Sequence, residues 1–367
     1  MTSKLELKRP SLHLDYFSDY KDRICQVLTW HHPTDRRLCI VKYDIGSSFW
    51  ISRETGIQYT RILKSYSLEG QIDNLLLVKK IEPSYVYHSI VYGVDFLAVP
   101  NERIKQYYYP EERLEEILAT SDDDLDEIEL KVKVLADLLN KYLKIPMKNM
   151  GITGSILWKG QTEKSDIDFM IYGNEYAQDF NEKFPILYEK NPEIQPMSPE
   201  KTKRYEESAA RKSGISSKLT RKYISRKRWL SVFGDTNLSI IFSPLSSELP
   251  FAYGDQIFTP IKAVDVECFV TNAAFGSVYP SIYEITDCKL LSTNKVKLDS
   301  PLERILSFEG ALTGFFKNND KIVVRGLLEK VVDKKNNRQF YQILLGTQEC
   351  SGNEFILYPE DYLQLKK

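Results

Sequence analysis

The stretch MGITGSILWKGQTEKSDIDFMIYG, from Met150 to Gly173, decides the fold expected for this chain. An apolar entry leads to the pair Gly154 and Ser155, and Asp166 and Asp168 stand further on at the head of an apolar run. In an extended strand alternate side chains point to the same face, so the two aspartates are expected to project together. The isoleucine between them and the phenylalanine after them are expected to point toward a core. The pattern predicts a phosphate-binding turn followed by a metal-binding strand.

The predicted chemistry follows from these residue types. Two carboxylates that share a site suit Mg²⁺ (or Mn²⁺), which binds through one or two carboxylates and the substrate's phosphates. Two such ions could align an attacking hydroxyl and stabilise a leaving pyrophosphate. Gly154 and Ser155 fit a strand-to-helix turn, where backbone N–H groups and the helix dipole attract phosphate. The alternative is an ordinary turn with two surface aspartates, but strand interiors disfavour Asp and two like charges on one face repel.

The motif resembles the signature of the nucleotidyltransferase superfamily that includes DNA polymerase β, the CCA-adding enzymes and the aminoglycoside adenylyltransferases. That signature is Gly-Ser, a loop, and Asp-x-Asp on a strand, and Ser165 and the apolar flanks agree with it. Over its length the chain is also similar to a group of archaeal predicted nucleotidyltransferases. This second resemblance includes the turn from His32 to Arg36 and the segment from Phe96 to Ile104. Both resemblances imply a fold and a reaction class, and neither names an acceptor.

The chain departs from the superfamily at the third carboxylate, which the resemblance places on a later strand. The candidate strand runs from Asn237 to Phe242, and Ser239 stands where an aspartate is expected. Asp235, just before that strand, is the nearest carboxylate and is the predicted third metal ligand. The alternatives are a distant acid or no third ligand, and the last would weaken metal binding or abolish catalysis.

Composition limits the class of protein. The 367 residues exceed the usual size of one domain, and 50 Lys and Arg against 51 Asp and Glu leave the chain near neutral. Any affinity for nucleic acid must therefore come from local patches. The five cysteines form no C-x-x-C pair, and no apolar run reaches the roughly 20 residues that span a bilayer. We expect a cytoplasmic protein with no membrane partner; its oligomeric state is not predicted.

The expected organisation is an α+β multidomain chain. Residues 1–108 form an N-terminal α+β region, residues 109–243 a central nucleotidyltransferase α/β core, and residues 244–367 a C-terminal all-β OB-like barrel. In the first region, strands are predicted from Ile24 to Trp30 and from Leu38 to Tyr43. The loop between them is either a solvated turn, which we favour, or a substrate-contacting loop with these side chains: His31, His32, Arg36 and Arg37.

A helical pattern leads into the motif strand. Apolar residues from Ile128 to Tyr142 recur three or four apart, which predicts an amphipathic helix. The acidic run from Asp122 to Glu129 precedes it and is interpreted as a helix cap and solvated face rather than a cation site.

The segment from Lys201 to Arg228 carries eleven positive and two negative residues, a local charge of +9. Such a field could hold a triphosphate or an RNA or DNA backbone, and Tyr205, Tyr223 and Trp229 could stack on bases. The alternative is a solvated basic helix. The predicted phosphate or nucleic-acid contacts are these: Arg211, Lys212, Lys218, Arg221, Lys222, Arg226, Lys227 and Arg228.

The β-rich tail is expected to form a small barrel. Five runs alternate apolar and polar residues: 263–270, 281–285, 304–316, 321–332 and 339–345. The segment around Val324-Arg325-Gly326 resembles an OB-fold. Its binding residues would be the following: Lys334, Lys335, Arg338, Phe340 and Tyr341. A structural or dimerisation barrel is the alternative.

The sequence therefore predicts an enzyme that uses Mg²⁺ to move a nucleoside monophosphate from an NTP to a hydroxyl, most plausibly on RNA or DNA. Asp166 and Asp168 would hold the metal, and Gly154 and Ser155 would hold the phosphates. The alternative is an inactive nucleotidyltransferase-like protein that binds nucleic acid or acts as a scaffold. The acceptor and the NTP are not predicted.

Overall fold

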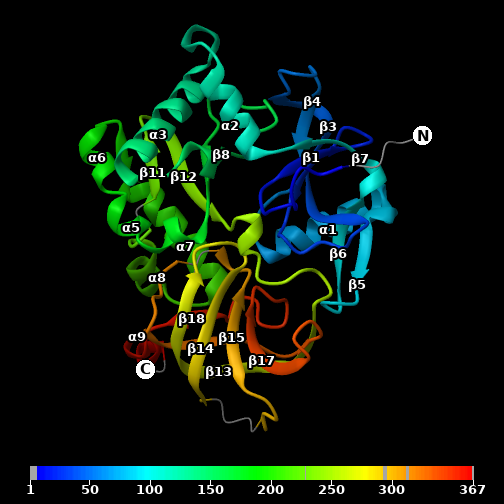
Figure 1. Cartoon of the computed structure of the whole chain (residues 1–367), viewed down its shortest axis with the longest axis vertical. Coiled ribbons are helices and arrows are strands. Elements are labelled where there is room, and N and C mark those ends of the chain that lie inside the picture. Colours follow the sequence, from blue (N-terminus) through cyan, green and yellow to red (C-terminus); the bar gives the residue numbers. More distant parts are fainter. Residues whose placement is uncertain (1–5, 228, 292–295, 311–313, 366–367) are drawn as a thin grey trace. The chain divides into compact units, whose positions relative to one another are not determined.

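The computed structural model describes residues 6–227, 229–291, 296–310 and 314–365 (Figure 1). The chain is a mixed α+β protein with several sheets, as expected, and it divides into two compact units. Unit 1 comprises residues 1–88, 95–197 and 228–249, and unit 2 comprises residues 89–94, 198–227 and 250–367. Within the described residues, no helix has the length and apolar character needed to cross a membrane.

The first sheet of unit 1 has seven strands in the order β5-β6-β3-β2-β1-β7, with β4 paired to β3. Helix α1 (Leu68–Ile81), capped by the Ser67 side chain, contributes the buried Val78 to the core of this sheet. The strands are β1 (Tyr16–Asp19), β2 (Ile24–Val27), β3 (Arg36–Ile51), β4 (Gln58–Arg61), β5 (Val86–Ser89), β6 (Val94–Pro100) and β7 (Ile104–Tyr108). The predicted pair of strands is present as the antiparallel pair β2 and β3.

The loop between β2 and β3 is held by its own side chains. His31 is buried, and His32 Nδ1 accepts from the Leu38 N–H at 3.0 Å. His32 Nε2 lies 2.7 Å from the Thr29 carbonyl oxygen, so the neutral ring donates there. The favoured interpretation as a solvated turn was therefore wrong for the histidines, which are structural.

The second sheet of unit 1 has five strands in the order β10-β11-β12-β9-β8. Figure 1 shows helix α3 beside this sheet, and α2 packs on β8. The strands are β8 (Met150–Ile152), β9 (Ile167–Tyr172), β10 (Ile194–Pro196), β11 (Leu230–Phe233) and β12 (Thr236–Ser243). The helices are α2 (Pro110–Ala119), α3 (Glu127–Leu143), α4 (Asn174–Gln178), α5 (Phe180–Lys183) and α6 (Ile186–Lys190).

Helix α3 confirms the predicted amphipathic pattern, because Ile128, Val132 and Leu135 are all buried. Asp126 is its N-cap, and the Asp126 side chain and the Glu129 side chain form a capping box with the backbone. The acidic run before the helix is thus a cap, as interpreted from the sequence.

Unit 2 contains a sheet whose strands close into a ring. Antiparallel pairs join β13 to β14, β14 to β15 and β16 to β17, while β15 and β17 are parallel and β13 pairs again with β16. The strands are β13 (Gln256–Phe275), β14 (Ser281–Leu290), β15 (Leu302–Ser307), β16 (Lys321–Asp333), β17 (Arg338–Leu345) and β18 (Phe355–Leu357). The run predicted over 304–316 ends as a strand at Ser307, and its residues 311–313 lie outside the described part.

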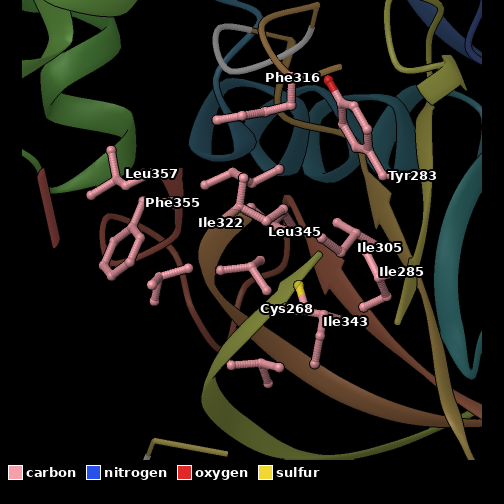
Figure 2. Packing of buried hydrophobic residues seen from close by; sticks show 14 of the residues in the cluster. Cys268, Tyr283, Ile285, Ile305, Phe316, Ile322, Ile343, Leu345, Phe355 and Leu357 are labelled. Atoms are coloured by element: carbon pink, nitrogen blue, oxygen red, sulfur yellow. The ribbon is translucent and has the colours of Figure 1, made fainter. Parts of the chain in front are cut away.

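The interior of this ring is apolar. Figure 2 shows side chains from four strands directed into it: Cys268, Ile285, Ile305 and Ile343. Helix α8 (Ser217–Ile224) contributes Tyr223 to the same core, and the other helices in the described part of unit 2 are α7 (Pro199–Ser213) and α9 (Pro359–Leu365). Phe340 and Tyr341, which were predicted as residues that bind a single strand, are buried.

Candidate functional site

Three neighbouring strands of unit 1 place the two aspartates. Strand β8 is antiparallel to β9, with Ile152 opposite Phe169, and the Thr153 N–H continues the pairing by donating to the Asp168 carbonyl oxygen at 2.9 Å. Ile167 and Phe169 are fully buried, whereas Asp168 between them is half-buried. The alternation that the sequence predicts is therefore present. Asp166 is exposed, one residue before the strand begins.

Gly154 lies directly against the carboxylate of Asp168. Its φ is +72°, in the left-handed region that L side chains rarely adopt. A Cβ at this position would lie 2.8 Å from Asp168 Oδ2. Glycine is therefore required here for two reasons, the backbone conformation and the close approach of the aspartate.

The segment after Gly154 is a series of turns and not the expected helix. Residues 154–159 have turn geometry, with the Lys159 N–H donating to the Ile156 carbonyl and the Gly160 N–H to that of Ser155. The helix prediction was wrong, so the phosphate cradle cannot rely on a helix dipole. The turn is instead fixed by packing, since Leu157 and Trp158 are buried in a cluster with Tyr16, Tyr43 and Tyr59.

Ser155 participates in the local hydrogen bonds of this turn. Its hydroxyl donates to Ser165 Oγ at 3.1 Å, and Ser165 Oγ accepts from the Thr162 N–H at 2.9 Å. Ser155 and Ser165 thus tie the two ends of the loop together beside Asp166. This arrangement brings the predicted residues Gly154, Ser155, Asp166 and Asp168 into one region of unit 1.

Neighbouring groups set the electrostatics of the two carboxylates. Asn237 on β12 donates from Nδ2 to Asp166 Oδ1 at 2.7 Å. Burial raises the pKa of Asp168 and the charge of Asp166 adds to the rise, whereas the charges of Lys42 and Arg61 lower that pKa. The two carboxylates therefore act on one another, and two cations from the first sheet partly compensate them.

Lys42 on β3 is the cation with the stronger effect on Asp168 and is buried, with 6% of its surface exposed. Burial lowers its pKa to about 8, and the charges of Asp168 and Asp166 act in the opposite direction. Its ammonium donates to Tyr16 Oη at 2.7 Å and lies over three tyrosine rings, at 5.2 to 5.5 Å from their centroids: Tyr16, Tyr43 and Tyr66. The lysine is held as a fixed internal charge.

Further hydrogen bonds hold the tyrosine that accepts from this lysine. Tyr16 and Tyr66 both donate to Gln26 Oε1, at 2.8 and 2.9 Å. Arg61 on β4 is exposed, and its guanidinium lies 5.5 Å from the centroid of the Tyr66 ring. The first sheet therefore contributes one buried and one exposed cation to the surroundings of Asp168.

The third metal ligand predicted from the sequence does not join the pair. Strand β12 runs parallel to β9 with Ser239 opposite Asp168, so a serine occupies the position where the resemblance expects an acid. Asp235 lies in the turn before β12, where its side chain is 90% exposed and pairs with Lys131 at 3.2 Å. Among the residues that the structure describes, no three His, Cys, Asp or Glu side chains are grouped so that they could hold a metal ion.

The donor set nevertheless fits one form of metal binding. Mg²⁺ needs only one or two protein carboxylates when substrate phosphates and water complete its shell. Asp166 and Asp168 supply two carboxylates whose charges interact, and Asn237 holds the Asp166 carboxylate by a hydrogen bond. An all-protein cage does not fit these residues, whereas an ion shared with a phosphate does.

Residues 201–227 of the basic segment belong to unit 2, where acidic or carbonyl groups engage part of them. Arg221 pairs with Glu206 at 2.8 Å and Lys222 with Asp361 at 2.7 Å, while Lys227 donates to the Gly310 carbonyl at 2.8 Å. Arg226 lies over the rings of Tyr223 and Tyr358. These four positive residues thus have partners among the described residues.

The other residues that were predicted to contact phosphate or nucleic acid lie in different surroundings. Arg211 and Lys218 are exposed, Lys212 lies in α7 with its side chain outside the description, and Arg228 lies outside the described residues. Tyr223 and Trp229 are buried, at 0% and 7% exposure, so their prediction as base-stacking residues was wrong.

The contribution of the first sheet was not predicted from the sequence. Lys42 is the one charged residue in the apolar run from Leu38 to Tyr43, and a lone lysine inside a strand is a usable signal of a buried, compensated charge. Asn237 and Arg61 carry no such signal, because nothing local distinguishes them from surface residues.

Comparison with known proteins gives one informative match. The chain is 30% identical over 229 residues to the uncharacterized protein MJ1086 of Methanocaldococcus jannaschii. The match covers 62% of this chain and 64% of that relative, so it spans less than two thirds of the relative's length. No protein-family model and no solved structure matches the chain.

Proposed function

We propose that unit 1 is a nucleotidyltransferase that uses a divalent cation, Mg²⁺ or Mn²⁺, to move a nucleoside monophosphate from an NTP to a hydroxyl. The observation that carries the proposal is the pair of interacting carboxylates, Asp166 one residue before β9 and Asp168 within it, with Gly154 against Asp168 in a conformation that glycine favours. The resemblance of the motif supports the same reaction class.

Each residue has a role in this proposal. Asp166 and Asp168 would hold the cation, which would neutralise charge on the phosphates and orient the attacking hydroxyl. The backbone of Gly154 and Ser155 would contact the phosphates. Arg61, which is exposed, would add a positive charge for the leaving pyrophosphate. Phosphoryl transfer depends mainly on positioning and electrostatics, so the site needs no protein nucleophile.

The test is incubation of the full chain with labelled NTPs, Mg²⁺ or Mn²⁺, and cellular RNA, DNA or small hydroxyl compounds. We expect label in one acceptor class, and a reduction of about 100-fold or more in Asp166→Asn and in Asp168→Asn. Asp235→Asn is the matched control, since Asp235 is an exposed aspartate of the same unit and should leave transfer intact. Equal labelling by all four proteins, or no labelling by the wild type with any NTP, would sink the proposal.

A second candidate, nucleic-acid binding by an inactive nucleotidyltransferase-like chain, is favoured by Ser239 and by the connectivity of unit 2. The ring β13-β14-β15-β17-β16, closed by β13 with β16, has the five strands expected of an OB-like barrel. The loop between β16 and β17 exposes Lys334 and Lys335. If this candidate holds, the double variant Lys334→Ala/Lys335→Ala binds single-stranded RNA or DNA more weakly, with a salt dependence lower by about one to two charges. Wild-type chain that binds neither polymer at low salt would exclude it.

A further inference from the structure

Strand β3 contains an inserted segment that redirects an aromatic side chain. Tyr59 on β4 is paired with Ile45 and again with Trp50, so residues 46–49 are inserted between the two pairings. Successive side chains of a regular strand point to opposite faces, whereas here the rings of Phe49 and Trp50 lie against one another, with their centroids 4.0 Å apart. Irregularities of this kind redirect side chains and are common beside functional sites.

The insertion places Phe49 on the surface. Phe49 is 67% exposed, and Ile45 and Ile51 on either side of it in β3 are 55% and 44% exposed. A single exposed apolar residue is ordinary on a protein surface. Phe49 differs from that case, because the Trp50 ring holds it in place while most of its own ring stays open to solvent.

A series of ring contacts connects this surface with the candidate site. The centroid of the Trp50 ring lies 5.4 Å from that of Tyr43, and the Tyr43 centroid lies 5.3 Å from that of Trp158. Trp158 belongs to the turn that follows Gly154 and packs there in the same cluster as Tyr43. These residues all belong to unit 1, so the exposed ring and the motif turn are joined by direct packing.

A positive charge lies on the same pair of strands. Arg61 on β4 is opposite Tyr43 in the register and is exposed. Its Nε donates to the Leu63 carbonyl at 2.9 Å, which holds the guanidinium in place. An unpaired base offers a flat ring that can stack on Phe49, and the strand that carries this base also brings phosphates that a cation attracts. The bases of a duplex are already stacked on one another and offer only its backbone.

We propose that Phe49, held by Trp50, is a stacking platform for an unpaired base of single-stranded RNA or DNA. The inference rests on the proposed function, because it takes this strand to be the acceptor that presents a hydroxyl to the site. Phe49 binds the acceptor and takes no part in the transfer itself.

The test measures the binding of fluorescein-labelled single-stranded RNA and DNA oligonucleotides to the full chain by fluorescence anisotropy, with no NTP and no added metal. Phe49→Leu keeps an apolar side chain but removes the ring, and it should weaken the binding of at least one of the two strands about tenfold. Phe49→Tyr keeps the ring and should bind as the wild type does. Leu76→Ala is the matched control, because Leu76 is an apolar residue of α1 in the same unit that is 50% exposed, and it should leave binding unchanged.

A duplex of the same sequence separates stacking from attraction to the backbone. Phe49→Leu should bind the duplex as the wild type does, because the contacts with the duplex are made to phosphates. An equal loss of single-strand and duplex binding in Phe49→Leu would overturn the inference. So would a loss in Phe49→Tyr as large as that in Phe49→Leu, because the ring would then not be the group that binds.

The other outcomes are equally decisive. A wild-type chain that binds neither strand would overturn the inference, as would equal single-strand binding by the wild type and a folded Phe49→Leu, checked by its near-ultraviolet circular dichroism. If Phe49→Leu changed only the oligomeric state, measured by light scattering, the surface would contact a second copy of the chain instead. Binding through Phe49 without nucleotide transfer would refute the proposed function and leave the platform standing, whereas transfer to a small hydroxyl compound by a chain that binds no strand would do the reverse.

Discussion

At the scale of single residues, Gly154 makes the most specific demand on the sequence. Gly154→Ala would force a Cβ within 2.8 Å of Asp168 Oδ2 at a φ of +72°. We expect nucleotide transfer to fall roughly 10- to 100-fold, because the carboxylate must move. Gly56→Ala is the control, since Gly56 has a φ of +71° with no atom near its Cβ position. Both variants should lose about 1 kcal/mol of stability; equal transfer rates for the two would contradict the role of Gly154.

His32 makes a prediction about acid stability. Burial lowers its pKa from 6.5 to about 3, and protonation would break the bond that Nδ1 accepts from the Leu38 N–H. The unfolded chain therefore takes up this proton first, so the stabilisation is complete above pH 6.5 and is lost as the pH falls toward 3. Chemical denaturation between pH 7 and pH 5 should show a smaller loss of stability in His32→Gln than in wild type, with His88→Gln, at an exposed histidine, as the control. An identical loss in His32→Gln would refute this.

At the scale of elements, the register between β9 and β12 determines which side chain of β12 lies opposite Asp168. Ser239 lies opposite Asp168, so Ser239→Asp would place a third carboxylate beside the pair. Mn²⁺ binding should tighten by on the order of tenfold because a negative charge is added next to the ion. Asp235→Asn should leave binding unchanged, as Asp235 pairs with Lys131 instead. Weaker binding by Asp235→Asn would restore Asp235 as a ligand.

The ring of strands in unit 2 carries a pH-sensitive carboxyl in β16. Burial raises the pKa of Glu329 to about 7, although Gln342 donates to it and Arg304 lies nearby. The folded state therefore holds this proton more tightly, and its stabilisation is complete below pH 4.5 and is lost as the pH rises through about 7. Glu329→Gln should be the more stable protein at pH 8, by about 2 to 3 kcal/mol, and should lose that advantage near pH 4.5. Urea titrations at the two pH values measure the difference, and a variant less stable than wild type at pH 8 would contradict the assignment.

These elements also show how far the sequence alone could lead. The motif strand, helix α3 and the strands of the ring follow from local patterns of apolar residues, and each was predicted near its observed position. The turn after Gly154 was not predicted, because its packing depends on contacts of Trp158 with Tyr43 and Tyr59. Those contacts join segments far apart in the chain, and no local periodicity records them.

At the scale of the whole molecule, contacts between distant segments also explain why the partners of the basic segment and the role of Lys42 were not predicted. A count of charges from Lys201 to Arg228 gives +9, but Lys222 pairs with Asp361 of α9, an acid that lies outside the counted segment. The charge of Lys42 on the first sheet acts on Asp168 of the second sheet, and both residues belong to unit 1. The N-terminal region, whose role the sequence left open, thus supplies part of the candidate site.

The central claim is nucleotidyl transfer at Asp166 and Asp168, and the position of the label tests it most directly. The full chain is given one NTP labelled at the α-phosphate or at the γ-phosphate, with Mg²⁺ and the acceptor found by the labelling screen. We predict that the α-label enters the acceptor and the γ-label leaves in pyrophosphate, and that Asp168→Asn does neither. Transfer of the γ-label to the acceptor, or α-label transfer that persists in Asp168→Asn, would contradict the account.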